Sequence, residues 1–222
     1  MRFLFRTAMV VPIVLSAALA ASKPHAITFG KWTPVKVTSD LDRSEDFKVR
    51  PLYVDGRLKE FTFGIPHEVT EQLFVVRRMI RVNDSLPQET ASTPRWSWQR
   101  GGWLVINRLN GHMSQATLPE FDPDSSSAGW YRDYVAYCGI SDDGRKLSAV
   151  VMQLGRRKPI LKKPLGEAAS ESASAPECSP PEWQRAPTRV SFVSKADQKL
   201  TFAVRGHTVE VVTDDEAEEG TE

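Results

Sequence analysis

Hydrophobic positions along the chain mostly alternate with polar ones or gather in short β-branched and aromatic stretches. Few segments show the 3.6-residue period of an amphipathic helix, so the pattern predicts strands. Turn residues separate these stretches, which is typical of antiparallel hairpins. We therefore expect an all-β fold in one domain spanning residues 26–213. Its predicted strands are Ile27–Val37, Lys48–Val54, Arg57–Phe63, Leu73–Val82, Trp103–Arg108, His112–Leu118, Tyr134–Cys138, Lys146–Leu154, Lys158–Leu165, Thr188–Val193, Lys199–Arg205 and Thr208–Thr213.

One of these strands has an alternative. Three arginines interrupt the apolar run of Leu73–Val82, so a short helix starting near Glu68 is also compatible with this stretch. Elsewhere the turn signals are stronger. Asp55-Gly56 suits the positive φ angles of a type I′ hairpin turn, and Asn110-Gly111 is a second such signal.

Glycine-centred turns form a loose internal repeat. Gly56, Gly111, Gly155 and Gly206 each lie between two predicted strands, at spacings of 55, 44 and 51 residues. The stretch DYVAYCGISDDGRKLSAVVMQLGRRKPILKKPL resembles one blade of a β-propeller, and WSWQRGGWLVINRLNGHMSQATLP resembles a second. Such blades repeat about every 40–50 residues. The resemblance implies a small propeller-like array, while a β-sandwich or an open barrel accounts for the same hairpins.

The N-terminus has the features of a secretory signal peptide, residues 1–20. Arg2 and Arg6 precede a short apolar run, and Ala18-Leu19-Ala20 supplies the small-x-small cleavage pattern. The run is shorter than the roughly 20 residues that a membrane-spanning helix needs, although an uncleaved anchor is the alternative. We expect a secreted or periplasmic protein with no membrane span after cleavage. In such a protein the Asn83-Asp84-Ser85 sequon is relevant only in a host that glycosylates it.

Charge argues against one class of partner. Cleavage removes Arg2 and Arg6, which changes the formal net charge from +1 to −1. An almost neutral chain lacks the basic field that nucleic-acid binding requires, so no nucleic-acid partner is expected.

The mature chain has two cysteines, Cys138 and Cys178. In an exported protein such a pair predicts a disulfide, which would contribute roughly 3–4 kcal/mol on the chain-entropy model; two unpaired thiols are the alternative. The bond would attach a flexible loop, residues 166–181, to the preceding strand. A disordered acidic tail is expected over residues 214–222.

Catalytic and metal-binding motifs are weak. There is no Gly-x-Ser-x-Gly elbow, no phosphate-binding glycine loop and no paired-histidine zinc motif. Asp122, Asp124 and Asp133 have part of the spacing of a calcium loop, but Ser127 occupies the position of its turn glycine. We expect no metal and no cofactor. The alternative function is an exported hydrolase whose site is dispersed over several loops, with these carboxylates and His112 as candidates.

Aromatic residues and arginines are concentrated in one region of about forty residues. Tryptophan, tyrosine and arginine are favoured at binding hot spots and can stack on sugars. The leading hypothesis is therefore an exported, non-catalytic binding or interaction module that contacts a protein or a glycan. The candidate binding residues are Trp96, Trp98, Arg100, Trp130, Tyr131 and Arg132.

Overall fold

The structure is a computed structural model that describes residues 24–38, 44–85, 95–167, 179–193 and 199–212. All-β architecture is confirmed: the described residues form three antiparallel sheets and no helix. The predicted signal peptide, the acidic tail and most of the 166–181 loop lie outside the described residues. The strands are β1 (Ile27–Phe29), β2 (Thr33–Thr38), β3 (Ser44–Val54), β4 (Arg57–Thr70), β5 (Leu73–Asn83), β6 (Trp96–Asn107), β7 (Met113–Gln115), β8 (Ala128–Tyr131), β9 (Tyr134–Ile140), β10 (Lys146–Gln153), β11 (Leu161–Glu167), β12 (Glu182–Gln184), β13 (Arg189–Val193), β14 (Lys199–Arg205) and β15 (Thr208–Val211).

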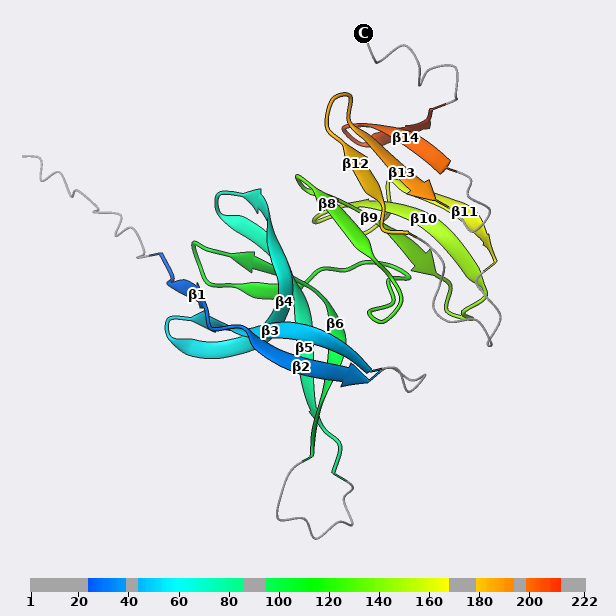
Figure 1. Cartoon of the computed structure of the whole chain (residues 1–222). Helices are drawn as coiled ribbons and strands as arrows, with labels where there is room; N and C mark the ends of the chain where they lie inside the picture. Colours follow the sequence, from blue (N-terminus) through cyan, green and yellow to red (C-terminus); the bar gives the residue numbers. More distant parts are fainter. Residues whose placement is uncertain (1–23, 39–43, 86–94, 168–178, 194–198, 213–222) are drawn as a thin grey trace, which may run out of the picture.

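The first sheet contains the strand order β1-β3-β4-β5-β6-β7, with β2 paired to β3 beside β1. Its long strands are strongly curved, and β2 comes into contact with β6 (Figure 1). The predicted turn at Asp55-Gly56 is confirmed, since both residues have positive φ, 51° and 74°. Asp55 also accepts hydrogen bonds from the backbone of Ala26 and pairs with His25, which holds the start of the described chain against this turn.

The helix considered near Glu68 is not formed. The segment instead continues β4, and the arginine-rich stretch that follows is β5. Arg77 fits into this strand because it is buried and donates hydrogen bonds to backbone carbonyls rather than to water. A charged residue in an apolar run was therefore compatible with a strand.

The other two sheets form a β-sandwich. One has the order β11-β10-β9-β8 and the other β12-β13-β14-β15. Their facing sides bury a common core, in which Ala136, Ala149 and Val151 of the first pack against Phe192 and Phe202 of the second. Trp183 of β12 adds a hydrogen bond from its Nε1 to the carbonyl of Gly129 in β8, at 3.0 Å.

The β8–β11 sheet is the middle layer of the molecule. Its second face carries Val135, Tyr137, Val150 and Met152, which are buried against Phe121 and neighbouring apolar groups. Because both faces are covered, β9 and β10 contain almost continuous apolar runs instead of an alternating pattern.

The propeller arrangement is not found. None of the three sheets closes into a propeller or a barrel, and two of the four glycine turns, at Gly56 and Gly111, belong to the same sheet. The stretch predicted as a second blade forms β6 and β7 of this sheet. The irregular spacing of the turns reflects strands of very different length rather than a repeated unit.

Cys138 is buried in β9 and is not a free thiol. Its predicted partner, Cys178, lies outside the described residues, so the Cys138–Cys178 pairing stays a prediction.

Candidate functional site

A cleft of about 800 Å³ lies between the curved first sheet and the middle sheet. Both walls are mainly apolar. Leu73 of β5 and Val105 of β6 contribute to one wall, while Val135 of β9 and Met152 of β10 contribute to the other. A concave, mostly apolar site of this size is typical of small-ligand binding.

Strand register explains the first wall. Val105 pairs with Val75 on one side and with Ser114 on the other, so these residues share one face of the sheet. Alternation turns the intervening Phe74 and Ile106 to the opposite face, where they are fully buried in a separate core. The cleft wall is consequently the second face of a sheet whose first face already has a core.

Charged groups stand at the border of the cleft. Arg156 and Arg157 follow Gly155, whose φ of 83° permits the tight turn after β10. Both arginines are exposed, and neither forms an ion pair with another described residue. Asp133, the acidic residue of the lining, accepts a hydrogen bond from the side-chain amide of Gln153 at 2.7 Å. Two cations and one hydrogen-bonded carboxylate thus give the cleft a basic border.

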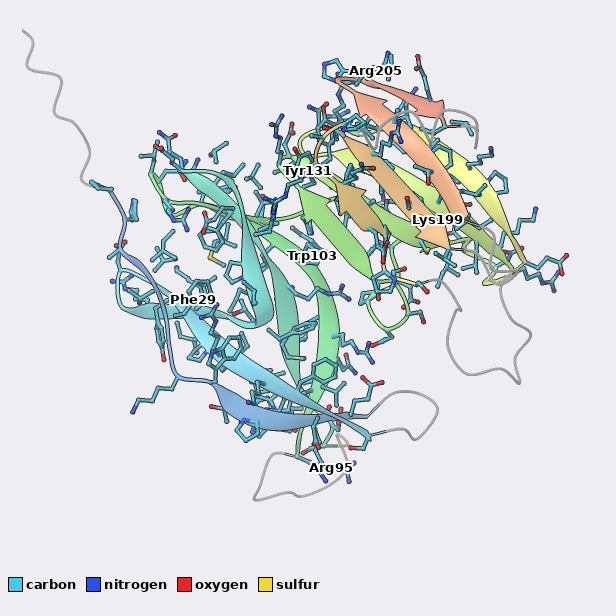
Figure 2. The ribbon with its side chains drawn as sticks, turned by 45° about the horizontal axis from the view of Figure 1, so that its top comes forward. Phe29, Arg95, Trp103, Tyr131, Lys199 and Arg205 are labelled. Carbon is cyan, nitrogen blue, oxygen red and sulfur yellow. The ribbon has the colours of Figure 1, made fainter. Side chains whose placement is uncertain are left out.

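Three aromatic rings join the two walls. The indole of Trp130 in β8 lies with its ring centroid 5.4 Å from that of Trp103 in β6 and 6.0 Å from that of His67 in β4. The Nε2 atom of His67 is 2.8 Å from the carbonyl oxygen of Arg132. Figure 2 shows Trp103 between the first sheet and the sandwich, on the side of β8. These contacts fix the separation of the walls.

The chain that connects β7 to β8 forms one border of the cleft, through Ala116, Thr117 and Leu118. It separates the cleft from a second cavity of about 350 Å³, which shares these residues and is also lined by Phe121. The hydroxyl of Tyr137 donates to the carbonyl of Pro119 at 2.7 Å, which attaches the connection to the middle sheet.

Arg77 attaches the same connection to the first sheet. Its guanidinium donates to the carbonyls of Gly101 and Pro123, at 2.7 and 2.6 Å, and lies over the ring of Phe121. Burial lowers the pKa of this group to about 10, and the nearby Arg100 adds to the effect. The connection is therefore held from both sides, by one buried arginine and one buried tyrosine.

The predicted binding residues are divided between two distant places. Trp96 and Trp98 lie near the start of β6, beside Arg95, which Figure 2 shows far from Tyr131. Trp96 is half exposed, but the guanidinium of Arg81 lies 4.3 Å from its ring centroid. The other two residues of this group also have partners: Trp98 packs on Phe61 within the first sheet, and Arg100 bonds to Glu45 of β3 and to the backbone carbonyl of Asp124 in the β7–β8 connection.

The second group, Trp130, Tyr131 and Arg132, lies beside the cleft. Trp130 lines it, whereas Tyr131 stacks on Trp183 of the sandwich. Arg132 is exposed in the turn after β8, with a φ of 52°. The six residues do not form one surface, and most of their ring faces are covered by other side chains of this chain.

The residues considered for a hydrolase are also separated. Asp133 alone of the four lines the cleft. Asp122 accepts hydrogen bonds from the backbone of Asp124 and Ser125 and so shapes a loop, which agrees with a turn function for this segment. His112 is exposed beside the turn before β7. In the described ranges, no three His, Cys, Asp or Glu residues are grouped closely enough to hold a metal ion.

Several cleft residues were not singled out as a site from the sequence. Arg156 and Arg157 are adjacent basic residues in the sequence, but nothing there connected them with the apolar wall formed by Leu73 and Val105, which comes much earlier in the chain. Leu73, Val105 and Met152 looked like ordinary core positions. The signal that could have been used is the unbroken apolar run Leu104-Val105-Ile106 of β6, which places apolar side chains on both faces of the sheet, one face more than a single core needs.

Comparisons with protein-family models, with curated proteins and with solved structures gave no match. The described part of the chain also lacks any helix of the length and hydropathy required to cross a bilayer.

Proposed function

We propose that the protein is an exported, non-catalytic binding module that holds an apolar part of its partner in the cleft between the first and middle sheets. The observation that carries this proposal is the cleft itself, whose two walls come from different sheets and are lined by Val105 and Met152 among other apolar side chains. A concave, mostly apolar cleft of this size, formed where two sheets meet, is typical of a ligand site.

A protein or a glycan was the expected partner, and the lining favours an apolar group over bare sugar rings. Sugar binding commonly uses an open aromatic face. Trp130 is the aromatic residue of the lining, and its ring is already stacked against His67 and bordered by Trp103. A glycan would therefore have to contact the cleft through an attached apolar substituent, whereas a protein could insert an apolar side chain.

The test uses the neutral apolar dye N-phenyl-1-naphthylamine, whose fluorescence rises in apolar surroundings. We expect saturable binding of one dye molecule to the native protein. Val105→Trp fills the cleft from the middle of one wall and is expected to reduce dye affinity at least tenfold. Val211→Trp, on a half-exposed residue of β15, is the matched control and should leave binding unchanged.

Equal dye binding by the native protein and the Val105→Trp variant would contradict the proposal. Circular dichroism and the urea midpoint of each variant establish that the two substitutions are compared in folded protein.

A further inference from the structure

We infer that the ligand of the cleft is a single-chain anionic amphiphile of the fatty-acid type, with its alkyl chain between the two sheets and its carboxylate on Arg156 and Arg157. This inference rests on the proposed function and adds to it the chemical class of the ligand.

The apolar walls of the cleft indicate that the ligand has an alkyl chain. Aliphatic side chains dominate them: Leu73 and Val105 on one side and Leu154 on the other, together with Val135 and Met152, which belong to the lining although they are almost completely buried. An alkyl chain can adapt to such a surface along its whole length, and methionine adds further adaptability. Burial of each methylene group is worth about a fourfold gain in affinity at most, so the preference should grow with chain length.

The basic border of the cleft indicates that the head group of the ligand is an anion. Arg156 and Arg157 line the cleft, are exposed to solvent and have no carboxylate partner in the part of the chain that the structure describes. A guanidinium matches the planar geometry of a carboxylate and can form two parallel hydrogen bonds to it. The carboxylate of Asp133 is occupied by Gln153 and is outnumbered by the two arginines. The border is therefore complementary to an anion and unfavourable for a quaternary ammonium head.

Two probes of equal chain length separate charge from hydrophobicity. Dodecanoate and dodecyltrimethylammonium, both below their micelle concentrations, compete with bound N-phenyl-1-naphthylamine on the full native protein. We expect dodecanoate to displace the dye at least tenfold more effectively. In the series octanoate, decanoate and dodecanoate, we expect affinity to rise by about two- to fourfold per methylene.

The variant test uses the double substitution Arg156→Gln and Arg157→Gln. It should weaken dodecanoate binding about tenfold or more, and should change binding of the neutral dye by a much smaller factor, because the dye carries no charge for the guanidinium groups to bind. Lys158→Gln changes the charge of the exposed neighbouring residue, which does not line the cleft, and should have little effect. Arg156→Glu with Arg157→Glu should reverse the preference in favour of dodecyltrimethylammonium.

Equal displacement by the two probes, an affinity independent of chain length, or unchanged dodecanoate binding by the double glutamine variant would each overturn the inference. In those cases the dye would still bind in the cleft, so the proposed function would remain. Failure of the proposed function would show itself separately, as dye binding insensitive to Val105→Trp.

Discussion

Arg77 joins the first sheet to the connection between β7 and β8. Its side chain crosses from β5 to the β7–β8 connection and satisfies one carbonyl on each side. The rings of Phe63, Trp103 and Phe121 surround the guanidinium and exclude water from it. A charge in such a place is costly by itself, and its hydrogen bonds and aromatic contacts offset that cost.

Arg77→Met should lower the free energy of unfolding by about 2 kcal/mol, because the carbonyls of Gly101 and Pro123 lose their donor. Urea unfolding measures the effect. Arg78→Met is the matched control: it removes a partly exposed ion pair with Glu60 and should cost less than about 1 kcal/mol. Equal costs for the two variants would show that Arg77 does not have the structural role described above.

Tyr137 should make the stability of the folded protein depend on pH in the alkaline range. Burial raises the pKa of its phenol above the usual value, and Glu120 contributes in the same direction. Below pH 10 the phenol is protonated in both the folded and unfolded states, so its stabilising contribution is fully present. Above pH 10 the unfolded state loses the proton first, and stability should fall.

Tyr137→Phe should therefore cost about 1 kcal/mol near neutral pH, through the lost bond to Pro119, and should reduce the loss of stability between pH 10 and 11. Urea midpoints at pH 8, 10 and 11 provide the measurement. Tyr53→Phe, on the first sheet, controls for general alkaline effects. If the native protein and Tyr137→Phe lost stability equally over this range, the burial effect would be refuted.

At the scale of elements, β8 and β12 approach one another closely at Gly129. A Cβ atom at this position would lie 2.7 Å from the carbonyl oxygen of Pro181. The backbone angles of Gly129 are not in the left-handed region, so any cost of an added methyl group comes from this contact.

Gly129→Ala should destabilise the protein by about 1–3 kcal/mol, because β8 has to move away from β12 or the Trp183 hydrogen bond has to lengthen. Thermal unfolding and the near-ultraviolet circular dichroism of the aromatic residues report the two effects. Ser127→Ala, an exposed position just before β8, should change neither. A fully stable Gly129→Ala variant would show that the two strands can separate at no cost.

Most strands could be predicted because alternation and turn residues act locally. The Asp55-Gly56 hairpin followed from its own dipeptide, and β9 and β10 followed from their apolar runs. By contrast, β8 and β12 were missed because both strands are short and are stabilised by residues distant in sequence. The hydrogen bond from Trp183 of β12 to the carbonyl of Gly129 in β8 is one such contact. Local patterns contain no information of that kind.

The candidate site was predictable to a smaller extent. Trp130 was predicted as an exposed binding residue, and its binding function stays a prediction; the structure places it in the lining of the cleft, with its ring in contact with His67 and Trp103. The cleft could not be derived because it depends on the distance between two sheets. Packing of whole layers sets that distance, and no single segment encodes it.

At the scale of the molecule, side chains around the cleft hold together its two halves, which are the first sheet and the β-sandwich. The contact of Trp103 with Trp130 joins β6 of the first sheet to β8 of the middle sheet. Edge-to-face pairs of this kind contribute energy beyond the area they bury.

A double-mutant cycle with Trp103→Leu and Trp130→Leu should give a coupling energy of about 0.5–1.5 kcal/mol in urea unfolding. The control cycle combines Trp98→Leu with Trp130→Leu, because Trp98 packs on Phe61 within the first sheet. Those two effects should add to within about 0.5 kcal/mol. Additivity in the Trp103 cycle would mean that the halves are joined mainly by other contacts.

The central position of the β8–β11 sheet has a consequence for how the chain folds. Both the sandwich core and the core beneath Phe121 need this sheet as one of their walls. Its β9–β10 hairpin closes through only a short turn, so it has a low contact order and a small loop-closure entropy. Folding should nucleate there, with φ-values highest at Val135 and Val150. The outer sheets, including the wall that completes the cleft, would then assemble late in the folding reaction.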